Sequence, residues 1–326
     1  MKNKLFAAVD VGTNTFRLLI AGVCYDRRKK NYTLKNIFSE RIVTRLGSGI
    51  SRNGILSEEA ITTSIAALVR FSNILSTYQV HKISAVATSA LREARNRDEF
   101  VRRTKAEAGL SIKIISGKQE AKTTASGMLM DIPVPEAALM ADIGGGSTEL
   151  IFSRRGKPLF VDSLDLGVVY LAGKYMRHDP PLKEDLTRME RYISRKIGEL
   201  EKHYLRFIPY DAGGKTVFIG TAGTVTTLAA VSHKLRDFEH GRIHNTRLTL
   251  KKVRDIFSFI APASSRERAG LIPFEPSRLD IIVPGTLILI KLMEFFSFRE
   301  IIVSNYGLRE GVLIDLYRKN EKKEFG

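Results

Sequence analysis

The chain has 326 residues, of which 44% are apolar and 27% charged, as is ordinary for a soluble globular protein long enough for two domains. Its 52 Lys and Arg against 35 Asp and Glu leave a formal charge of +17, which favours polyanionic partners such as nucleic acids, anionic membranes, nucleotide phosphates or phosphate polymers. The single cysteine excludes an intrachain disulfide, and no apolar run is long enough to cross a bilayer, so we expect a cytoplasmic protein without a membrane segment.

The first predicted elements are an apolar strand, a polar turn and a second apolar strand, in AAVDVGTNTFRLLI (7–20). The same pattern returns 132 residues later in LMADIGGGSTELIF (139–152). The aligned pairs are Asp10 with Asp142, Gly12 with Gly144, Thr15 with Ser147 and Leu18 with Leu150. An offset this long does not suit a solenoid repeat, and it predicts two related domains that each open with a β-hairpin. Cys24 follows the first hairpin in an apolar pattern and is expected in the core.

Helices and strands alternate through the rest of the chain. The first half continues with a predicted helix at 57–78, a strand at 82–88, a helix at 97–109 and a strand at 111–116. The second hairpin is followed by a helix at 182–204, a strand at 216–220, a mainly helical stretch at 250–297, a strand at 300–304 and a helix at 308–318. The last residues, 317–326, are expected to form a frayed polar tail. This alternation predicts an α/β protein.

Both glycine turns predict an anion-binding site, because glycine lets a ligand approach the backbone and successive amides form a concavity for anions. Hydroxyl and amide donors lie in or beside the turns at Thr13, Asn14, Thr15, Ser147 and Thr148. The aspartates need another explanation, because a carboxylate repels phosphate. Asp10 and Asp142 could hold Mg²⁺, directly or through water, or could only shape their turns. Their repetition favours a shared phosphate and metal site.

Other chemistries are excluded by their missing patterns. The turns do not fit GxxxxGK[ST], so the chain has no P-loop, and no GxGxxG follows the first strand. The six histidines show no compact zinc-ligand spacing.

Seven segments, in order, resemble the exopolyphosphatase/guanosine pentaphosphate phosphohydrolase (Ppx/GppA) family of the actin, heat-shock chaperone and sugar-kinase superfamily. They are DVGTNTFRLLI (10–20), ATSALREARN (87–96), IISGKQEA (114–121), DIGGGSTELIF (142–152), SLDLGVVYL (163–171), GTAGTVTTLAA (220–230) and VSNYGLREGVL (303–313). The resemblance implies an α/β fold of two ribonuclease-H-like (actin-like ATPase) domains flanking a cleft. Domain I would comprise 1–122 plus 301–326, and domain II 123–300. The chain is too short for the C-terminal helical extension of longer members, so long-chain processivity is in doubt.

The resemblance also implies roles for individual residues. Glu120 matches the glutamate that orients or activates the attacking water, although an acid in the first turn of a helix is also favoured by the helix dipole. The family usually has two adjacent glutamates here, and this chain has Gln119 before Glu120. Arg92 matches an arginine that faces the phosphate, and its fork suits phosphate oxygens.

The implied site is completed by three further groups. The phosphate-binding set is Thr13, Asn14, Arg92, Gly144, Gly145, Gly146 and Ser147. Residues expected close to the substrate are Arg17, Thr148, Gly220 and Thr221, and those expected to hold Mg²⁺ are Asp10 and Asp142. Gly220 and Thr221 could equally belong to an ordinary strand-to-helix turn.

The activity so implied is Mg²⁺-dependent hydrolysis of the terminal phosphoanhydride of inorganic polyphosphate, with release of orthophosphate. Hydrolysis of guanosine pentaphosphate is the closest alternative, because it shares the terminal chemistry. Phosphate transfer from polyphosphate to ADP and a non-enzymatic switch that binds guanosine tetraphosphate are further alternatives. Nucleic acid and membrane partners are not expected, and the resemblance leaves a homodimer open because the family often dimerises.

Overall fold

The computed structural model describes residues 4–26, 31–48, 50, 54–130, 132–200, 216–237 and 240–325. The chain folds as two compact units, Met1–Pro133 with Tyr306–Gly326 and Val134–Asn305, named unit 1 and unit 2 below. Neither boundary between the two units coincides with the predicted boundary. The predicted boundary at 122/123 would cut helix α5 (Gly117–Met128), which packs on α14 (Leu308–Phe325) in unit 1. The boundary at 300/301 would cut strand β11 (Glu300–Val303), which pairs with β9 (Thr216–Thr221) in unit 2.

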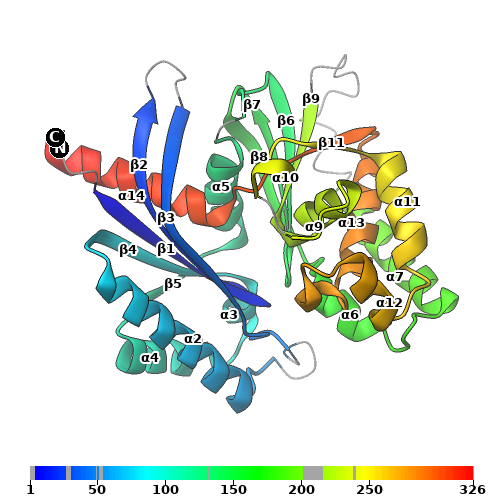
Figure 1. The fold of residues 1–326 in the computed structure, drawn as a ribbon, viewed down its shortest axis with the longest axis horizontal. Helices are drawn as coiled ribbons and strands as arrows, with labels where there is room; N and C mark the ends of the chain where they lie inside the picture. The colour runs from blue at the N-terminus through cyan, green and yellow to red at the C-terminus, as the bar shows by residue number, and fades with distance from the viewer. Residues whose placement is uncertain are drawn as a thin grey trace. The chain divides into compact units, whose positions relative to one another are not determined.

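Unit 1 contains a five-stranded sheet in the order β3-β2-β1-β4-β5. The strands are β1 (Leu5–Val11), β2 (Thr15–Asp26), β3 (Asn31–Val43), β4 (Val80–Ala87) and β5 (Ile112–Ile114). The first three run antiparallel as a meander, and β4 and β5 join in parallel. Helices α2 (Glu58–Thr77), α3 (Ser89–Glu93) and α4 (Arg97–Ala108) complete the unit with α5 and α14 (Figure 1).

Helices cover both faces of this sheet, because its central strand is apolar on both sides. Val9 of β1 packs in one cluster with Leu68 of α2 and Phe100 of α4. Its neighbour Ala8 packs in another cluster with Leu313 of α14. Successive side chains of a strand point to opposite faces, so β1 is buried throughout and Asp10 at its end is held firmly.

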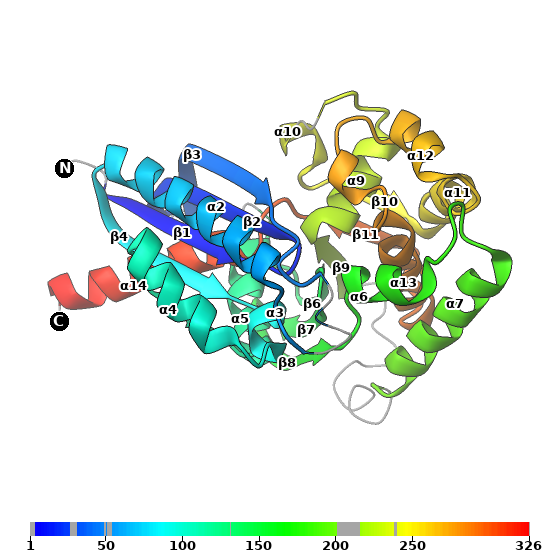
Figure 2. The ribbon, with the colours of Figure 1, turned by 90° about the horizontal axis from the view of Figure 1, so that it is seen from below.

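Unit 2 contains a six-stranded sheet in the order β10-β11-β9-β6-β7-β8. The new strands are β6 (Ala137–Ile143), β7 (Thr148–Arg154), β8 (Lys157–Leu164) and β10 (Arg247–Thr249). The helices are α6 (Val168–Tyr175), α7 (Lys183–Gly198), α9 (Ala222–Ser232), α10 (His240–Ile243), α11 (Leu250–Ile260), α12 (Ser265–Leu271), the 3₁₀ helix η1 (Pro276–Arg278) and α13 (Ile282–Phe295) (Figure 2). Strands β6, β9 and β11 are parallel to one another, and the other neighbours pair antiparallel.

The two sheets share one topology. Strands β6, β7, β8, β9 and β11 follow the same order and directions as β1 to β5. The register agrees as well, since Asp10 lies opposite Arg17 in β1–β2 and Asp142 lies opposite Glu149 in β6–β7, at the same offset. The predicted α/β class and pair of ribonuclease-H-like domains are therefore confirmed. Among the described residues, no helix combines the length and the apolar character that a membrane span requires.

Two sequence-based predictions are wrong. Cys24 is exposed, because it lies among the last residues of β2, beyond the part of the strand that is buried, and its sulfur lies 2.9 Å from Oγ1 of Thr33. The C-terminal segment is not frayed from 317, since α14 runs to Phe325. Asn320 is buried there and its Oδ1 lies 2.8 Å from Nε2 of His81, on β4.

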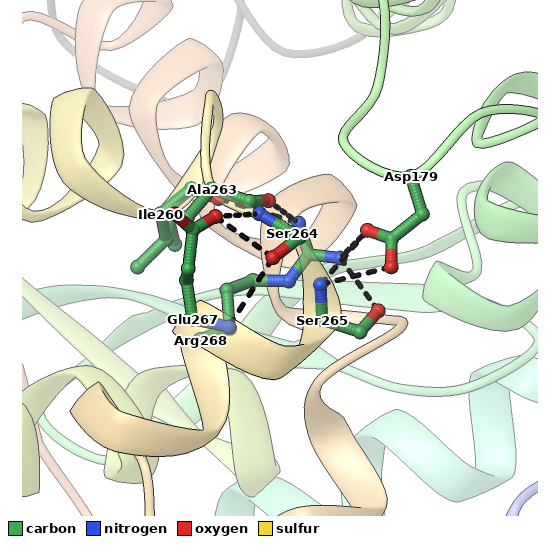
Figure 3. Close-up of polar contacts among 7 residues, drawn as sticks. All are labelled: Asp179, Ile260, Ala263, Ser264, Ser265, Glu267 and Arg268. Carbon is green, nitrogen blue, oxygen red and sulfur yellow. Dashed lines mark hydrogen bonds and ion pairs between the residues drawn. The ribbon is translucent and has the colours of Figure 1, made fainter.

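A buried arginine fastens the loop before α7 to the start of α12. Nη1 of Arg268 donates to the carbonyl of Ala263 at 2.7 Å, and Nη2 donates to Oδ1 of Asp179 at 3.2 Å (Figure 3). The same carboxylate accepts from the backbone N–H of Ser265 at 2.8 Å. Arg268 is 1% exposed, so these contacts satisfy a cation inside unit 2.

Candidate active site

The glycine turn of unit 2, residues 144–147, is closed by its own backbone and by the start of α6. The N–H of Gly144 donates to the carbonyl of Ser147 at 2.9 Å. The carbonyls of Gly144 and Gly145 accept from the N–H groups of Val168 and Val169, at 3.1 and 2.9 Å. The first turn of α6, whose N–H groups have no partner within the helix, is therefore satisfied by this turn.

These bonds set the direction of two other N–H groups. In a trans peptide the N–H points opposite to the preceding carbonyl. Because the carbonyls of Gly144 and Gly145 point to α6, the N–H groups of Gly145 and Gly146 point away from it. Neither of them donates to an acceptor in the described part of the chain. The turn therefore presents two adjacent donors, as an anion site requires.

Gly167, the N-cap of α6, makes this close approach possible. A Cβ atom at Gly167 would lie 2.2 Å from the carbonyl carbon of Gly146 and 2.4 Å from the oxygen of Gly145. Both neighbours are backbone atoms, which cannot rotate out of the way. Only glycine therefore fits where the helix meets the turn.

A row of polar side chains crosses the unit 2 sheet beside this turn. Asp142 of β6 lies opposite Glu149 of β7, which lies opposite Ser163 of β8, and Asp142 also pairs with Thr221 of β9. Residues directly opposite across a ladder project from the same face, so the four side chains share a face. Glu149 is 1% exposed and its Oε1 accepts from the hydroxyls of Ser147, at 2.7 Å, and Ser163, at 2.8 Å.

Two of these residues fit a divalent cation. Asp142 and Glu149 provide carboxylate oxygens from facing positions on rigid strands, which suits Mg²⁺ because this ion is usually held by one or two carboxylates plus water and substrate phosphate. Within the described ranges, no group of three or more His, Cys, Asp or Glu side chains gathers as a complete protein cage for a metal.

In unit 1 the position that corresponds to Glu149 is occupied by Arg17, which has the opposite charge. Asp10 lies across from Arg17, and Nη1 of Arg17 is 3.8 Å from Oδ2 of Asp10. Burial raises the pKa of Asp10, and the nearby guanidinium of Arg17 opposes this shift. Since Asp10 already has a cation beside it, it fits Mg²⁺ less well than Asp142 does.

The unit 1 turn is shaped by the segment that follows β3. The carbonyl of Asn14 accepts from the N–H groups of Thr44 and Arg45, at 3.1 and 3.0 Å, and that of Thr13 accepts from Gly47 at 2.8 Å. A Cβ at Gly47 would lie 2.3 Å from Cγ2 of Thr13. Thr13 is buried and Asn14 half-buried, so both are held in the turn.

Glu120 and Arg92 meet inside unit 1. Nη1 of Arg92 lies 2.6 Å from Oε2 of Glu120 and also donates to the carbonyl of Ile115 at 3.1 Å. Their side chains are 21% and 10% exposed. Ser116 caps α5 by accepting from the N–H of Gln119, and this fixes Glu120 in the first turn of the helix. The arginine thus neutralises the carboxylate that the sequence predicts to be catalytic.

Several predicted residues have contacts that account for them without a ligand. The hydroxyl of Thr148 donates to the carbonyl of Leu166 at 2.6 Å, and that of Thr221 donates to Ser304 at 2.9 Å. A Cβ at Gly220 would lie 2.4 Å from Cδ1 of Ile301, so this glycine packs closely against the side chain of β11. The hydroxyl of Ser147, which the sequence predicts to bind phosphate, donates to Oε1 of Glu149 at 2.7 Å.

Sequence reasoning missed two residues. Glu149 could have been found, because the repeat places it at the position of Arg17 and the strand alternation puts it on the face of Asp142. Arg278 carried no local signal. Its guanidinium covers the start of α9, where a Cβ at Gly223 would lie 1.5 Å from Nη2, and its buried charge has Glu275 at 4.0 Å.

Known proteins resemble this chain over nearly its whole length. The model of the Ppx/GppA phosphatase family matches residues 26–320. Exopolyphosphatase 2 of Mycobacterium tuberculosis is 28% identical over 95% of this chain and 98% of its own length. The bifunctional 3-dehydroquinate synthase/phosphatase of Fusobacterium nucleatum is 31% identical over 96% of this chain, which spans only 46% of that relative. The crystal structure of the Aquifex aeolicus member of the Ppx/GppA family superposes with a TM-score of 0.78 at 30% identity, covering 97% of this chain and 98% of that one.

Proposed function

Since the chain belongs to the Ppx/GppA phosphatase family, whose members hydrolyse phosphoanhydrides, we propose that it is an Mg²⁺-dependent exopolyphosphatase. Water attacks the terminal phosphorus of inorganic polyphosphate, the bond to the bridging oxygen breaks, and orthophosphate leaves. The Mycobacterium tuberculosis relative that matches over its full length bears the name of this activity. The bifunctional relative shares only its phosphatase name with the proposal.

The observation that carries the proposal is the turn at 144–147. It directs the N–H groups of Gly145 and Gly146 away from α6, and the strands that it joins carry Asp142 and Glu149 at facing positions. Amide donors suit phosphoryl oxygens, whereas carboxylates repel them unless a cation lies between. The combination therefore supports a phosphoryl group bound together with a metal, and a site for a neutral ligand would not need both.

Each of the candidate site residues then has a role in a reaction that depends on positioning and charge. The N–H groups of Gly145 and Gly146 hold oxygens of the terminal phosphoryl group. Glu120 aims the attacking water and accepts its proton. Arg92 binds a phosphate oxygen with its fork, and the phosphate competes with Glu120 for this cation.

Mg²⁺ held by Asp142 and Glu149 would neutralise charge on the phosphoryl oxygens. Glu149 has its orientation set by two hydroxyls, so it is prepared to receive the ion. Asp10, paired with Arg17, is assigned instead to shaping the unit 1 turn and orienting that arginine.

Phosphate release by the wild type and by Glu120→Gln, with and without Mg²⁺, tests the proposal. We expect polyphosphate hydrolysis that requires Mg²⁺ and falls by about 100- to 10,000-fold in the variant, because amide nitrogen and oxygen do not accept the water's proton. Glu58→Gln is the matched control, since Glu58 also lies in the first turn of a helix and pairs with an arginine at 2.6 Å, but on the exposed surface of α2. It should retain full activity.

The same assay separates the alternatives. Guanosine pentaphosphate is supplied as the only substrate in one arm, and polyphosphate with ADP in another. Faster turnover of guanosine pentaphosphate than of polyphosphate, or formation of ATP, would replace the proposal with that activity. Unchanged hydrolysis by Glu120→Gln would remove Glu120 from the mechanism.

A further inference from the structure

Glu149 is an unusual residue to find inside a sheet. It is 1% exposed in the middle of three adjacent strands, and the three residues that follow it on β7, Leu150–Phe152, are apolar and buried. An ionised carboxylate in such a place loses its hydration, so hydrogen bonds or a cation must compensate. Two hydroxyls do so here, and both bond the same oxygen, Oε1.

The two hydroxyls come from different parts of the fold. Ser147 belongs to the glycine turn and lies two residues before Glu149 in the sequence. Ser163 lies on β8, directly opposite Glu149 across the antiparallel ladder. The β7–β8 register is continuous from Thr148 to Phe152 and shifts only beyond it, so the position of Ser163 is set by regular backbone pairing.

This arrangement fixes the plane of the Glu149 carboxylate. Donors that converge on Oε1 restrain rotation of the group and stabilise its negative charge. The row then runs from Ser163 through Glu149 to Asp142. Glu149 and Asp142 are the proposed metal ligands, and Ser163 supports the first of them. A hydroxyl on the side of Glu149 opposite Asp142 is in the place where a metal ligand's outer partner is found.

We propose that Ser163 is a positioning residue that orients Glu149 for the cation, and this rests on the function proposed above. In this role Ser163 acts through Glu149 and does not contact the substrate. Substitution of Ser163 tests the orientation of Glu149 alone. Substitution of Ser147 would disturb the glycine turn as well, because Ser147 belongs to it.

The chain offers a matched control in Ser153. It lies on β7, the strand of Glu149, and is 1% exposed, and its hydroxyl has no hydrogen-bond partner among the residues that the structure describes. Ser153→Ala therefore removes a buried hydroxyl from the same sheet without touching Glu149. Ser163→Thr keeps the hydroxyl and adds a methyl group that a strand accommodates, so it tests for rescue.

Mn²⁺ binding to the substrate-free protein, measured by electron paramagnetic resonance, tests the proposal. We expect Ser163→Ala to weaken binding by about 10- to 100-fold, and Ser153→Ala and Ser163→Thr to stay within about twofold of the wild type. The Mg²⁺ concentration for half-maximal phosphate release should rise in parallel, while kcat at saturating Mg²⁺ changes little. Thermal melting confirms that each variant is folded.

Ser163→Ala that binds Mn²⁺ as tightly as the wild type would overturn the proposal, as would an equal loss in Ser153→Ala. A wild type that binds no Mn²⁺ would overturn it too. Failure of the proposed function gives a different result: Mn²⁺ binding that depends on Ser163, in a protein that releases no phosphate from polyphosphate.

Discussion

The repeated turns differ most at one residue, and this difference assigns different roles to the two aspartates. Asp10 faces a cation, Arg17, and Asp142 faces an anion, Glu149, at equivalent positions of equivalent hairpins. A metal is attracted to the second pair and repelled by the arginine of the first. The function proposed above therefore assigns the cation to the hairpin of unit 2, whereas Asp10 in the hairpin of unit 1 has Arg17 beside it.

The ionised form of Asp10 is disfavoured by burial, and this leads to a prediction about stability. Burial raises the pKa of Asp10, so its ionised form is less favourable in the folded protein than in the unfolded chain near neutral pH. We expect Asp10→Asn to raise the melting temperature, because the amide keeps the shape and removes the buried charge. The variant should also lose about 10- to 100-fold in kcat/KM, because Arg17 loses the carboxylate that orients it.

Thermal unfolding and phosphate release, measured on the same preparation, check both parts. Asp26→Asn is a suitable control, since Asp26 also lies in the sheet of unit 1 but on another strand, as the last residue of β2. A lower melting temperature for Asp10→Asn would show that the ion pair with Arg17 outweighs the burial of the charge.

At the scale of elements, the turn at 144–147 and helix α6 form one device. The helix receives its first hydrogen-bond acceptors from the turn, and the turn receives its direction from the helix. Gly167 is the contact between them, with a Cβ clash of 2.2 Å against backbone. The proposed phosphate site is therefore built from two elements, the glycine turn and the start of α6, that hold each other in place.

This contact predicts opposite results for two glycines of one helix. Gly167→Ala should destabilise the protein by about 2 kcal/mol, because a methyl group is forced against backbone, and should lower activity by about 100-fold through displacement of the turn. Gly173→Ala, with no atom within 4 Å of its Cβ, should stabilise the protein by about 0.5–1 kcal/mol through helix propensity and leave activity unchanged. Chemical denaturation and phosphate release measure both, and equal behaviour of the two variants would contradict the account.

The sequence predicted the elements whose patterns are local. The two hairpins were visible because Asp, Gly and a hydroxyl recur at one spacing, and α2 was visible from its apolar period and its Ser57 cap. Strands β3 and β8 were missed. Their outer position leaves many side chains half-exposed, so neither shows a clean apolar alternation. The third strand of each meander could have been inferred only from its partner.

The site was predictable only as far as it is local. Both aspartates, the glycines and Glu120 lie in short motifs, whereas Arg278 reaches Gly223 from 55 positions later in the chain. Thr148 was predicted near the substrate because it follows Ser147, but alternation turns it to the opposite face, where it bonds Leu166. A partner that lies on another element, or on the other face of a strand, leaves no trace in a motif.

At the scale of the whole molecule, the two units carry carboxylates whose pKa values are shifted in opposite directions. In unit 1, burial raises the pKa values of Asp10 and Asp315. In unit 2, the pKa of Asp179 is lowered, chiefly by the hydrogen bond from the backbone of Ser265 (Figure 3). The pKa of Asp185 is lowered too, chiefly by its hydrogen bond with His178.

The sign of each contribution follows from these directions. A group with a lowered folded pKa stabilises the protein above its unfolded value, which is 3.8 for Asp179 and Asp185, and this is lost as the pH falls through the folded value. A group with a raised folded pKa destabilises the protein above that value, and the penalty is relieved as the pH falls toward 3.8. Acid should therefore first favour unit 1 and then disfavour unit 2.

Hydrogen exchange followed by mass spectrometry, corrected for the intrinsic rate at each pH, measures the two units separately. Between about pH 7 and pH 4 we expect protection of β1 and β4 to increase while that of α12 stays constant, and below about pH 4 protection of α12 to decrease first. Asp10→Asn should abolish most of the gain in β1, because it removes the group that titrates, and Asp179→Asn should weaken the acid response of α12. Equal loss of protection in both units over the whole range would mean that their stabilities are coupled more strongly than their separate carboxylates can shift them.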